Sequence, residues 1–414
     1  MKKVLLISAT ATILAAFCLV TLTTSANNAP KAVTYSKDVA PILYKNCAEC
    51  HRPGEVAPFS VLSYKDVRPW AKSIKEQVAS KQMPPWHADP AHGQWKNDRR
   101  LAQADLDAII AWVNGGALEG NPKELPPAPK FIAGWNIGQP DQTFSIPEQK
   151  IPTTGVVAYQ YLTVKTNFTE DKWIQAAEIN SSGRDAVHHV IVFIKAPGIT
   201  TGNEQSLLCG TAPGEQPAQF PSGYARRVPA GAELVFQMHY TPNGKATSDV
   251  TTLGLIYAKE PVKRAVLTRG VMQMKFEIPA GAAAHEVRSQ YTFTEDAHIT
   301  SFMPHMHLRG KDFIYTAYFP DGTSRVLLNV PRYDFNWQTY YVPQETVAMP
   351  KGTRIECIAH FDNSPANKFN PDPAKLVKWG EQTWEEMMIG WVSFYNDSAP
   401  VKPAAGSASS SSEK

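Results

Sequence analysis

The stretch "DAVHHVIVFI", residues 185–194, begins with two adjacent histidines and continues as an apolar run rich in β-branched residues. Such a run is typical of a buried strand. Successive side chains of a strand point to opposite faces of the sheet, so His188 and His189 should diverge, and each is costly to bury without a partner. The two imidazoles can share one ion only where the strand is irregular. We therefore expect a bulge or a strand start at 188–189.

Other segments of the same kind follow the chain from about residue 135 to about 400. Four of them are short, rich in β-forming residues and separated by Gly, Pro and Asn turns: "YQYLTVKT", "ELVFQMHY", "FIYTAYF" and "TRIECIAHF". No alternation of strand and helix patterns occurs among them. Because one sandwich takes about 100 residues, this region predicts two β-sandwiches, at residues 135–262 and 263–400.

The part of the chain before these strands has a different pattern. Residues 33–121 read as helical, because "SKDVAPILYKNC" and "QADLDAIIAWVNGG" carry apolar residues at helical spacing. A proline-rich linker, residues 122–134, separates this all-α domain from the strands. The low-complexity end, residues 401–414, is expected to be disordered.

The first 26 residues predict export of the protein. They have a basic start, an apolar stretch and small residues before a cleavage site after Ala26, which is the organisation of a signal peptide. The alternative is an uncleaved membrane anchor. No later segment has the roughly 18 apolar residues that a membrane-spanning helix requires. We therefore expect a periplasmic or secreted protein with no stable membrane span after cleavage.

The overall composition bounds the function. The 414 residues carry a formal net charge of only +3, with 43% hydrophobic and 10% aromatic residues. Nearly balanced charge argues against a nucleic-acid partner, and the length is sufficient for several packed domains. Five cysteines are too few for a disulfide scaffold of this size. Cys209 and Cys357 fall in different sandwiches, and we expect Cys357 to be a small buried apolar side chain.

The sequence "CAECH", residues 47–51, has the spacing at which a c-type haem is attached. Cys47 and Cys50 would bond covalently to the haem, and His51 would bind its iron from one side. The alternatives are a redox disulfide or half of a zinc site. A zinc site would need two further ligands, and the helical domain has no second cysteine pair. We therefore expect one covalent haem c.

The other axial ligand of the haem iron is expected to come from "MPPWHADPAH", residues 83–92. Met83 is preferred, with His87, His92 or a vacant position as the alternatives. With its helices, its early C-x-x-C-H and its later Met-Pro, this domain resembles the class I cytochromes c.

Histidines gather in two further motifs of the β region. "LVFQMHY" contains His239, and "SFMPHMHLRG" contains His305 and His307, so five of the 11 histidines lie in three short motifs. On a strand, His-x-His places both imidazoles on one face. A thioether is offered nearby by "TWEEMMIGWVSFY", through Met387 or Met388. Imidazole together with thioether favours copper.

Four motifs, taken in order, resemble the type II copper, ascorbate-dependent monooxygenases, which include peptidylglycine α-hydroxylating monooxygenase and dopamine β-monooxygenase. They are "HHVIVF", "FQMHY", "PHMHLRG" and "EEMMIGW". The resemblance implies two all-β, jelly-roll-like sandwiches that face a solvent-filled cleft and hold one copper each. It assigns the electron-transfer copper to His188, His189 and His239. It assigns the copper at which oxygen binds and hydroxylation occurs to His305, His307 and Met387.

Three positions depart from the peptide-hydroxylating members of that family. Where those members have an arginine two residues before the His-x-His pair, this chain has Met303. Where they have Asn and Tyr after the methionine ligand, it has Ile389 and Trp391. The resemblance therefore implies a small organic substrate other than a peptidylglycine, and a more apolar site.

The sequence favours an exported monooxygenase that uses O2. Electrons would come from a periplasmic donor or an ascorbate-like reductant and reach two coppers through the haem. The alternatives are an electron-transfer or copper-binding cytochrome c fusion without hydroxylase activity, and a scaffold for partner binding.

Overall fold

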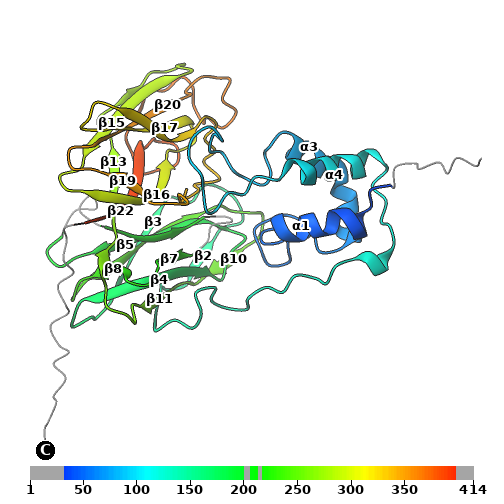
Figure 1. Ribbon diagram of the computed structural model, residues 1–414, viewed down its shortest axis with the longest axis horizontal. Coiled ribbons are helices and arrows are strands. Elements are labelled where there is room, and N and C mark those ends of the chain that lie inside the picture. Colours follow the sequence, from blue (N-terminus) through cyan, green and yellow to red (C-terminus); the bar gives the residue numbers. More distant parts are fainter. Residues whose placement is uncertain (1–31, 200–205, 213–216, 398–414) are drawn as a thin grey trace, which may run out of the picture. The chain divides into compact units, whose positions relative to one another are not determined.

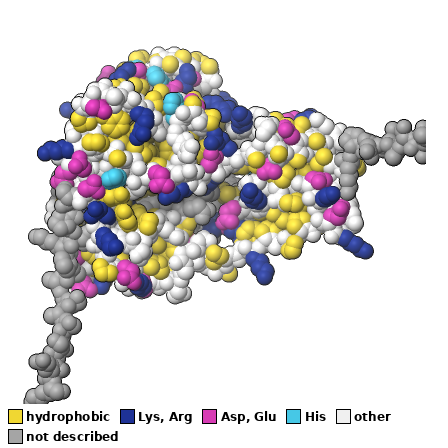
Figure 2. All heavy atoms as spheres, in the orientation of Figure 1, with side chains coloured by type: hydrophobic (Ala, Val, Ile, Leu, Met, Phe, Trp, Pro, Cys, Tyr) yellow, Lys and Arg dark blue, Asp and Glu magenta, His cyan; other side chains and the backbone are white. Residues whose placement is uncertain are grey.

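The computed structural model describes residues 32–199, 206–212 and 217–397. The expected signal peptide, residues 1–26, and the expected disordered end, residues 401–414, lie outside the described residues. Within the described ranges, no helix is both long and apolar enough to cross a bilayer. On the face shown in Figure 2, basic and acidic side chains are interspersed, in line with the small net charge.

The N-terminal part is a small helical region, residues 33–124 (Figure 1). Its elements are η1 (Tyr35–Val39), α1 (Ala40–Asn46), α2 (Tyr64–Val67), η2 (Arg68–Trp70), α3 (Ala71–Ala79), α4 (Gln103–Asn114) and η3 (Pro122–Glu124). Apolar residues at helical spacing meet in one core, which includes Leu43 of α1 and Ile109 and Trp112 of α4. Helix α4 ends where Gly116 adopts a positive φ of 92°, a conformation that glycine adopts without strain.

The first sandwich is built from two sheets (Figure 1). One sheet has the order β1-β11-β4-β8-β12, with β7 also paired to β4, and the other has the order β3-β9-β5-β6. A separate pair joins β2 and β10. The strands are β1 (Gln142–Ser145), β2 (Gln149–Ile151), β3 (Gln160–Lys165), β4 (Lys172–Ser181), β5 (Val187–Lys195), β6 (Ser206–Thr211), β7 (Ala218–Gln219), β8 (Tyr224–Val228), β9 (Glu233–Tyr240), β10 (Thr247–Asp249), β11 (Thr251–Tyr257) and β12 (Arg264–Ala265).

The second sandwich has the sheets β13-β22-β16-β19 and β15-β20-β17-β18, and a separate pair of β14 and β21. Its strands are β13 (Leu267–Met272), β14 (Glu277–Ile278), β15 (His285–Thr292), β16 (Ala297–His305), β17 (Gly310–Tyr318), β18 (Ser324–Val330), β19 (Val347–Met349), β20 (Arg354–Phe361), β21 (Val377–Lys378) and β22 (Ile389–Asn396). The expectation of a helical region followed by β-sandwiches is therefore confirmed.

Strands β5 and β9 show why the two faces of one sheet have different roles. Alternate residues such as Val190 and Phe236 lie in the core between the sheets. The residues between them, such as Ile191 and Gln237, line a cavity on the other face. This alternation follows from the pleat. At the end of each strand, a histidine can therefore lie on the side of the second sandwich.

A segment of the helical region packs on the second sandwich. This strap, residues 86–97, contributes Trp86 and Trp95 to the apolar core of that sandwich. The Trp95 ring meets the Tyr341 ring edge-on, with 5.5 Å between centroids. The Lys96 N–H donates to the Val342 carbonyl (2.8 Å), and the Asn97 amide donates to the Tyr340 carbonyl (2.6 Å). The strap therefore ties the helical region to the second sandwich by apolar and polar contacts together.

Candidate metal centre

Three histidines of the first sandwich converge on one point. His188 and His189 are the second and third residues of β5, and His239 lies near the end of β9. The Nδ1 atoms of His188 and His189 are 3.2 Å apart, and those of His239 and His189 are 3.4 Å apart. One ligand atom from each residue lies within 4.8 Å of the others, so this three-histidine cluster could hold one metal ion.

A bulge in β5 makes the cluster possible. Val187 pairs with Tyr240 and His189 pairs with His239, so two steps along β5 match one step along β9. His188 is the extra residue, and the expected bulge at 188–189 is confirmed. A bulge re-aims one side chain of a strand. Two neighbouring imidazoles can therefore face the same point, which a regular pleat would forbid.

The cluster is held in the uncharged form that a metal requires. Burial lowers the pKa of His239 to about 3, and burial together with the neighbouring imidazoles lowers the pKa of His189 well below its usual range. The Nε2 atoms of His188 and His189 are buried and have no hydrogen-bond partner among the described residues. Because unpartnered buried nitrogens are costly and neutral imidazole is a good metal ligand, these residues fit a bound metal ion.

A second pair of imidazoles, His305 and His307, lies in the second sandwich. Their ring centroids are 5.2 Å apart and the rings are nearly perpendicular, at 88°. His305 Nδ1 contacts the Gln338 side-chain oxygen at 2.7 Å, and His307 Nδ1 contacts the Glu385 carbonyl at 3.1 Å. Each acceptor requires Nδ1 to carry the proton, which leaves Nε2 free to bind a metal. His307 Nε2 is buried without a partner among the described residues.

The position of His307 differs from the expectation that both histidines of the pair lie on one strand. His305 is the last residue of β16, but His307 lies beyond the strand. The reason is that the His307 N–H donates to the Glu386 side chain instead of to a neighbouring strand. Burial lowers the pKa of His305 to about 4 and that of His307 well below its usual range, so both rings are neutral near pH 7.

The two adjacent methionines have different surroundings. Met388 is fully buried and its sulfur accepts a hydrogen bond from the Ser289 hydroxyl (3.3 Å). Met387 lines a cavity of about 680 Å³ together with His305. Of the two thioethers, Met387 is therefore the one on the side of the histidine pair. Ile389 and Trp391, the positions that depart from the peptide-hydroxylating pattern, line the same cavity.

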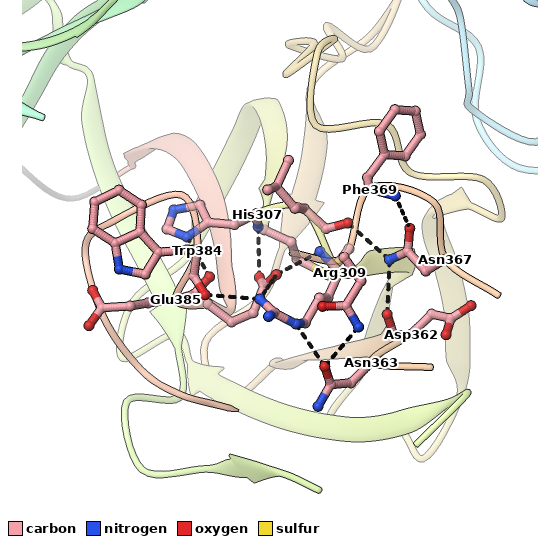
Figure 3. A network of polar contacts seen from close by, with 12 residues as sticks. His307, Arg309, Asp362, Asn363, Asn367, Phe369, Trp384 and Glu385 are labelled. Atoms are coloured by element: carbon pink, nitrogen blue, oxygen red, sulfur yellow. Dashed lines mark hydrogen bonds and ion pairs between the residues drawn. The ribbon is translucent and has the colours of Figure 1, made fainter. Parts of the chain in front are cut away.

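A buried polar network that includes Arg309 adjoins His307 (Figure 3). The Glu386 carboxyl is 0% exposed and accepts the backbone N–H groups of His307 (2.8 Å) and Arg309 (2.7 Å). The Arg309 guanidinium is 1% exposed and donates to the Asn363 side-chain oxygen (2.9 Å) and to the Trp384 carbonyl (3.0 Å). Burial raises the pKa of the Glu386 carboxyl to about 8, although both N–H donors and Arg309 oppose the rise.

Sequence reasoning missed this network. The motifs "PHMHLRG" and "EEMMIGW" contain Arg309 and Glu386, but the sequence pattern assigned neither residue a role in the site. One sequence feature could have indicated the network. Arg309 lies two residues after His307, and the oppositely charged Glu386 lies one residue before Met387, each in an otherwise apolar segment.

Two aromatic rings lie between the three-histidine cluster and the histidine pair. Tyr159 has its ring centroid 4.6 Å from that of His239 and 6.2 Å from that of His307. The Phe335 ring stacks on His188, with 5.1 Å between centroids, and lies 5.9 Å from His307. The resemblance implied a solvent-filled cleft at this point. Here the rings occupy it, and the 680 Å³ cavity lies beside His305 and Met387.

The C-x-x-C-H motif lies just past helix α1. Cys47 and Cys50 are free thiols, and burial raises the pKa of Cys47 to about 12. His51 Nδ1 contacts the Phe59 carbonyl at 3.2 Å, which leaves its Nε2 free. Two unpaired thiols beside an oriented imidazole are what covalent haem attachment requires, so these residues fit that group.

The candidates for the other axial ligand lie apart from each other. Met83 is half-buried, and the described contacts do not join it to His51. His87 lies between Trp86 and Ala88, which pack in the core of the second sandwich, and burial lowers its pKa, with smaller effects from Asp334 and Arg332 of that sandwich. His87 therefore belongs to the strap contact, whereas Met83 as a ligand stays a prediction.

The C-x-x-C-H motif and the three-histidine cluster border one cavity of about 130 Å³. Cys50 and Glu55 line it from the helical region, and His188 and His189 line it from β5. Arg184 Nη1 donates to the Glu55 carboxylate across this contact, at 2.7 Å.

The remaining cysteines and one further histidine have structural roles. Cys209 and Cys357 are buried free thiols in separate sandwiches, as expected for Cys357. His360 Nδ1, on β20, contacts the Asp312 carboxylate of the neighbouring strand β17 at 2.6 Å.

Comparisons with known proteins assign no family. No family model and no curated protein matches the chain. Among solved structures, the chain is similar to the major capsid protein P2 from bacteriophage PM2, with 10% identity and a TM-score of 0.31 over 62% of this chain and 97% of that chain. It is also similar to PNGase F, a glycosylasparaginase from Flavobacterium meningosepticum, with 14% identity and a TM-score of 0.26 over 64% of this chain and 99% of that chain. Both similarities are too low to assign an activity.

Proposed function

We propose that this protein is an exported copper-dependent monooxygenase that uses O2 to hydroxylate a small organic substrate, with electrons supplied through a covalent c-type haem. One observation carries the proposal: a three-histidine cluster that could hold a metal ion, together with a second histidine pair of which His305 lines a large cavity with Met387. A periplasmic donor or an ascorbate-like reductant would return electrons to the haem. The N-terminal sequence supports a periplasmic or secreted location.

Each group of ligands has its own role in this proposal. One copper would be held by His188, His189 and His239, and the other by His305, His307 and Met387. Bound there, copper supplies one-electron redox chemistry and the activation of O2 that C–H hydroxylation requires. Gln338 and the Glu385 carbonyl fix the orientation of the two rings in the second group, and Glu386 fixes the chain that carries His307.

The cavity has the size of a small-molecule site. Its volume of about 680 Å³ is within the usual range of such sites. Ile389 and Trp391 line its wall, where the peptide-hydroxylating pattern has polar residues. Lys195, Arg269 and Glu381 line it as well, so a substrate beside His305 would meet charged groups together with apolar ones.

The proposal predicts two coppers per haem in purified, copper-reconstituted protein. The His305→Ala variant should bind one, because it loses a ligand of the second group and leaves the three-histidine cluster intact. The measurement is elemental analysis of copper and zinc, divided by haem from its absorbance.

The matched control is His298→Ala, which removes a histidine that contacts Asp397 and matches no ligand motif. It should keep two coppers per haem. Absence of tightly bound copper, or a preference for zinc, would overturn the monooxygenase proposal. Two filled copper sites without O2 uptake beyond haem oxidation would favour an electron-transfer protein instead.

A further inference from the structure

We propose that the strap positions the His305 imidazole, and that it does so by holding the loop between β18 and β19, residues 331–346. Trp95 and Asn97 of the strap are then positioning residues, because they act on His305 through Gln338 of this β18–β19 loop, and neither lines the cavity beside His305. The inference deepens the proposed function, and it rests on that function only where it concerns a bound metal.

The β18–β19 loop reaches the histidine pair at two points. The buried Gln338 side-chain oxygen accepts from His305 Nδ1 at 2.7 Å. The Tyr333 hydroxyl donates to the Met306 carbonyl (2.7 Å) and accepts the Met306 N–H (3.1 Å), so it holds the residue between the two histidines. A displacement of this loop would therefore move the hydrogen-bond partner that orients the His305 ring.

The end of the loop lies as a short strand between the strap and β16. Tyr341 exchanges two backbone hydrogen bonds with Phe302 of β16, at 2.8 and 3.0 Å. On the other side, the Lys96 N–H of the strap donates to the Val342 carbonyl at 2.8 Å. Neighbouring residues of a strand direct their backbone groups to opposite sides. Without the strap, this segment would therefore have an open edge.

Asn97 continues this pairing with its side chain. Its amide nitrogen donates to the Tyr340 carbonyl at 2.6 Å, and its amide oxygen accepts the Val342 N–H at 3.1 Å. The side chain thus takes the place of a peptide group of a neighbouring strand. Replacement of Asn97 would remove both hydrogen bonds and leave the apolar contacts of the strap in place.

The strap also holds the beginning of the loop. The Asp89 N–H donates to the carbonyl of Asn329, the last residue but one of β18, at 2.8 Å. The Asn329 amide donates in return to the Asp89 carboxylate at 3.1 Å. One segment of the chain therefore fixes both ends of the loop that carries Gln338.

Trp95 joins the strap to the strand that carries His305. Its ring meets the Phe302 ring edge-on, with 6.1 Å between centroids, and Phe302 lies three residues before His305 in β16. Gly93 has a positive φ of 79°, and a Cβ at this position would lie 2.5 Å from the Trp95 ring. The glycine therefore lets the chain pass close to this ring, which keeps the ring in the core of the second sandwich.

The first test uses the full chain without added metal. In Asn97→Ala, hydrogen exchange of residues 331–346 should quicken by roughly tenfold to a hundredfold, because two hydrogen bonds of ordinary net strength are lost. Carbethoxylation of His305 by diethyl pyrocarbonate, followed by mass spectrometry, should quicken as well, because Gln338 holds the ring less firmly. The matched control is Asn121→Ala, which removes an asparagine that accepts the Lys123 N–H in η3 at 3.1 Å and should leave both rates unchanged.

A metal titration shows whether the strap acts through Gln338. In copper-reconstituted protein, competition with a chelator should show one copper bound roughly tenfold to a hundredfold more weakly in Gln338→Leu, the usual effect of removing a partner of a ligating histidine. Asn97→Ala should weaken the same copper and leave the copper of the three-histidine cluster unchanged. The double variant should differ little from Gln338→Leu, because changes that act through one group are not additive.

Three results decide the inference. Unchanged hydrogen exchange in Asn97→Ala, or faster exchange with unchanged reactivity of His305, would overturn the positioning role. Additive effects of Asn97→Ala and Gln338→Leu on copper binding would overturn the route through Gln338. If the unchanged protein binds no copper while Asn97→Ala still quickens both metal-free reactions, the proposed function fails and the positioning of His305 stands.

Discussion

Replacement of Arg309 with alanine is expected to lower the free energy of unfolding by about 3–6 kcal/mol, because two hydrogen bonds from a buried charged group are lost, at about 1.5–3 kcal/mol each. Arg309 is 1% exposed and lies 4.0 Å from the Glu386 carboxyl. Its loss would leave the Trp384 carbonyl without this donor and the Asn363 side-chain oxygen with the Asn370 amide as its donor. Because Glu386 also holds the His307 backbone, the copper content should fall from two per haem toward one.

Urea unfolding of the copper-free protein measures the stability change. Arg325→Ala is the matched control, since Arg325 is exposed on β18 and should change stability by no more than about 0.5 kcal/mol. A loss for Arg309→Ala of about 1 kcal/mol or less, the value of a surface ion pair, would show that the network does not support the site.

The local sequence pattern was sufficient to predict the part of the site that lies on strands. The alternation in "ELVFQMHY" placed Gln237 and His239 on one face, because the pleat fixes side-chain direction within a single strand. The bulge at His188 followed from the same argument, since two adjacent histidines on a regular strand would diverge. The structure pairs His189 with His239 and leaves His188 as the extra residue.

Long-range contacts account for what the sequence pattern could not predict. Arg309 and Asn363 are 54 residues apart, and no periodicity relates two buried polar groups in different loops. The strap is a similar case. Its Trp86 lies in the segment that the sequence indicated as the source of an axial ligand, whereas the rings of Trp86 and Trp95 are buried in the second sandwich. Two large aromatic side chains in a loop require an apolar partner, but their own sequence does not identify it.

Removal of both thiols of the C-x-x-C-H motif is expected to abolish covalent haem. The unchanged protein, exported by a bacterium with a cytochrome c maturation system, should keep its haem after denaturation and solvent extraction, because thioether bonds survive both. The variant Cys47→Ser, Cys50→Ser should keep none, measured by haem absorbance and by peroxidase staining of denatured protein. Its copper content should stay at two, since neither thiol belongs to a copper ligand group.

The control for this loss is Cys209→Ser, which changes a buried thiol of the first sandwich and should leave haem attachment unchanged. If the unchanged protein carries no covalent haem, Cys47, Cys50 and His51 must serve another purpose. External reductant would then have to reach the three-histidine cluster directly through the cavity that Cys50 lines.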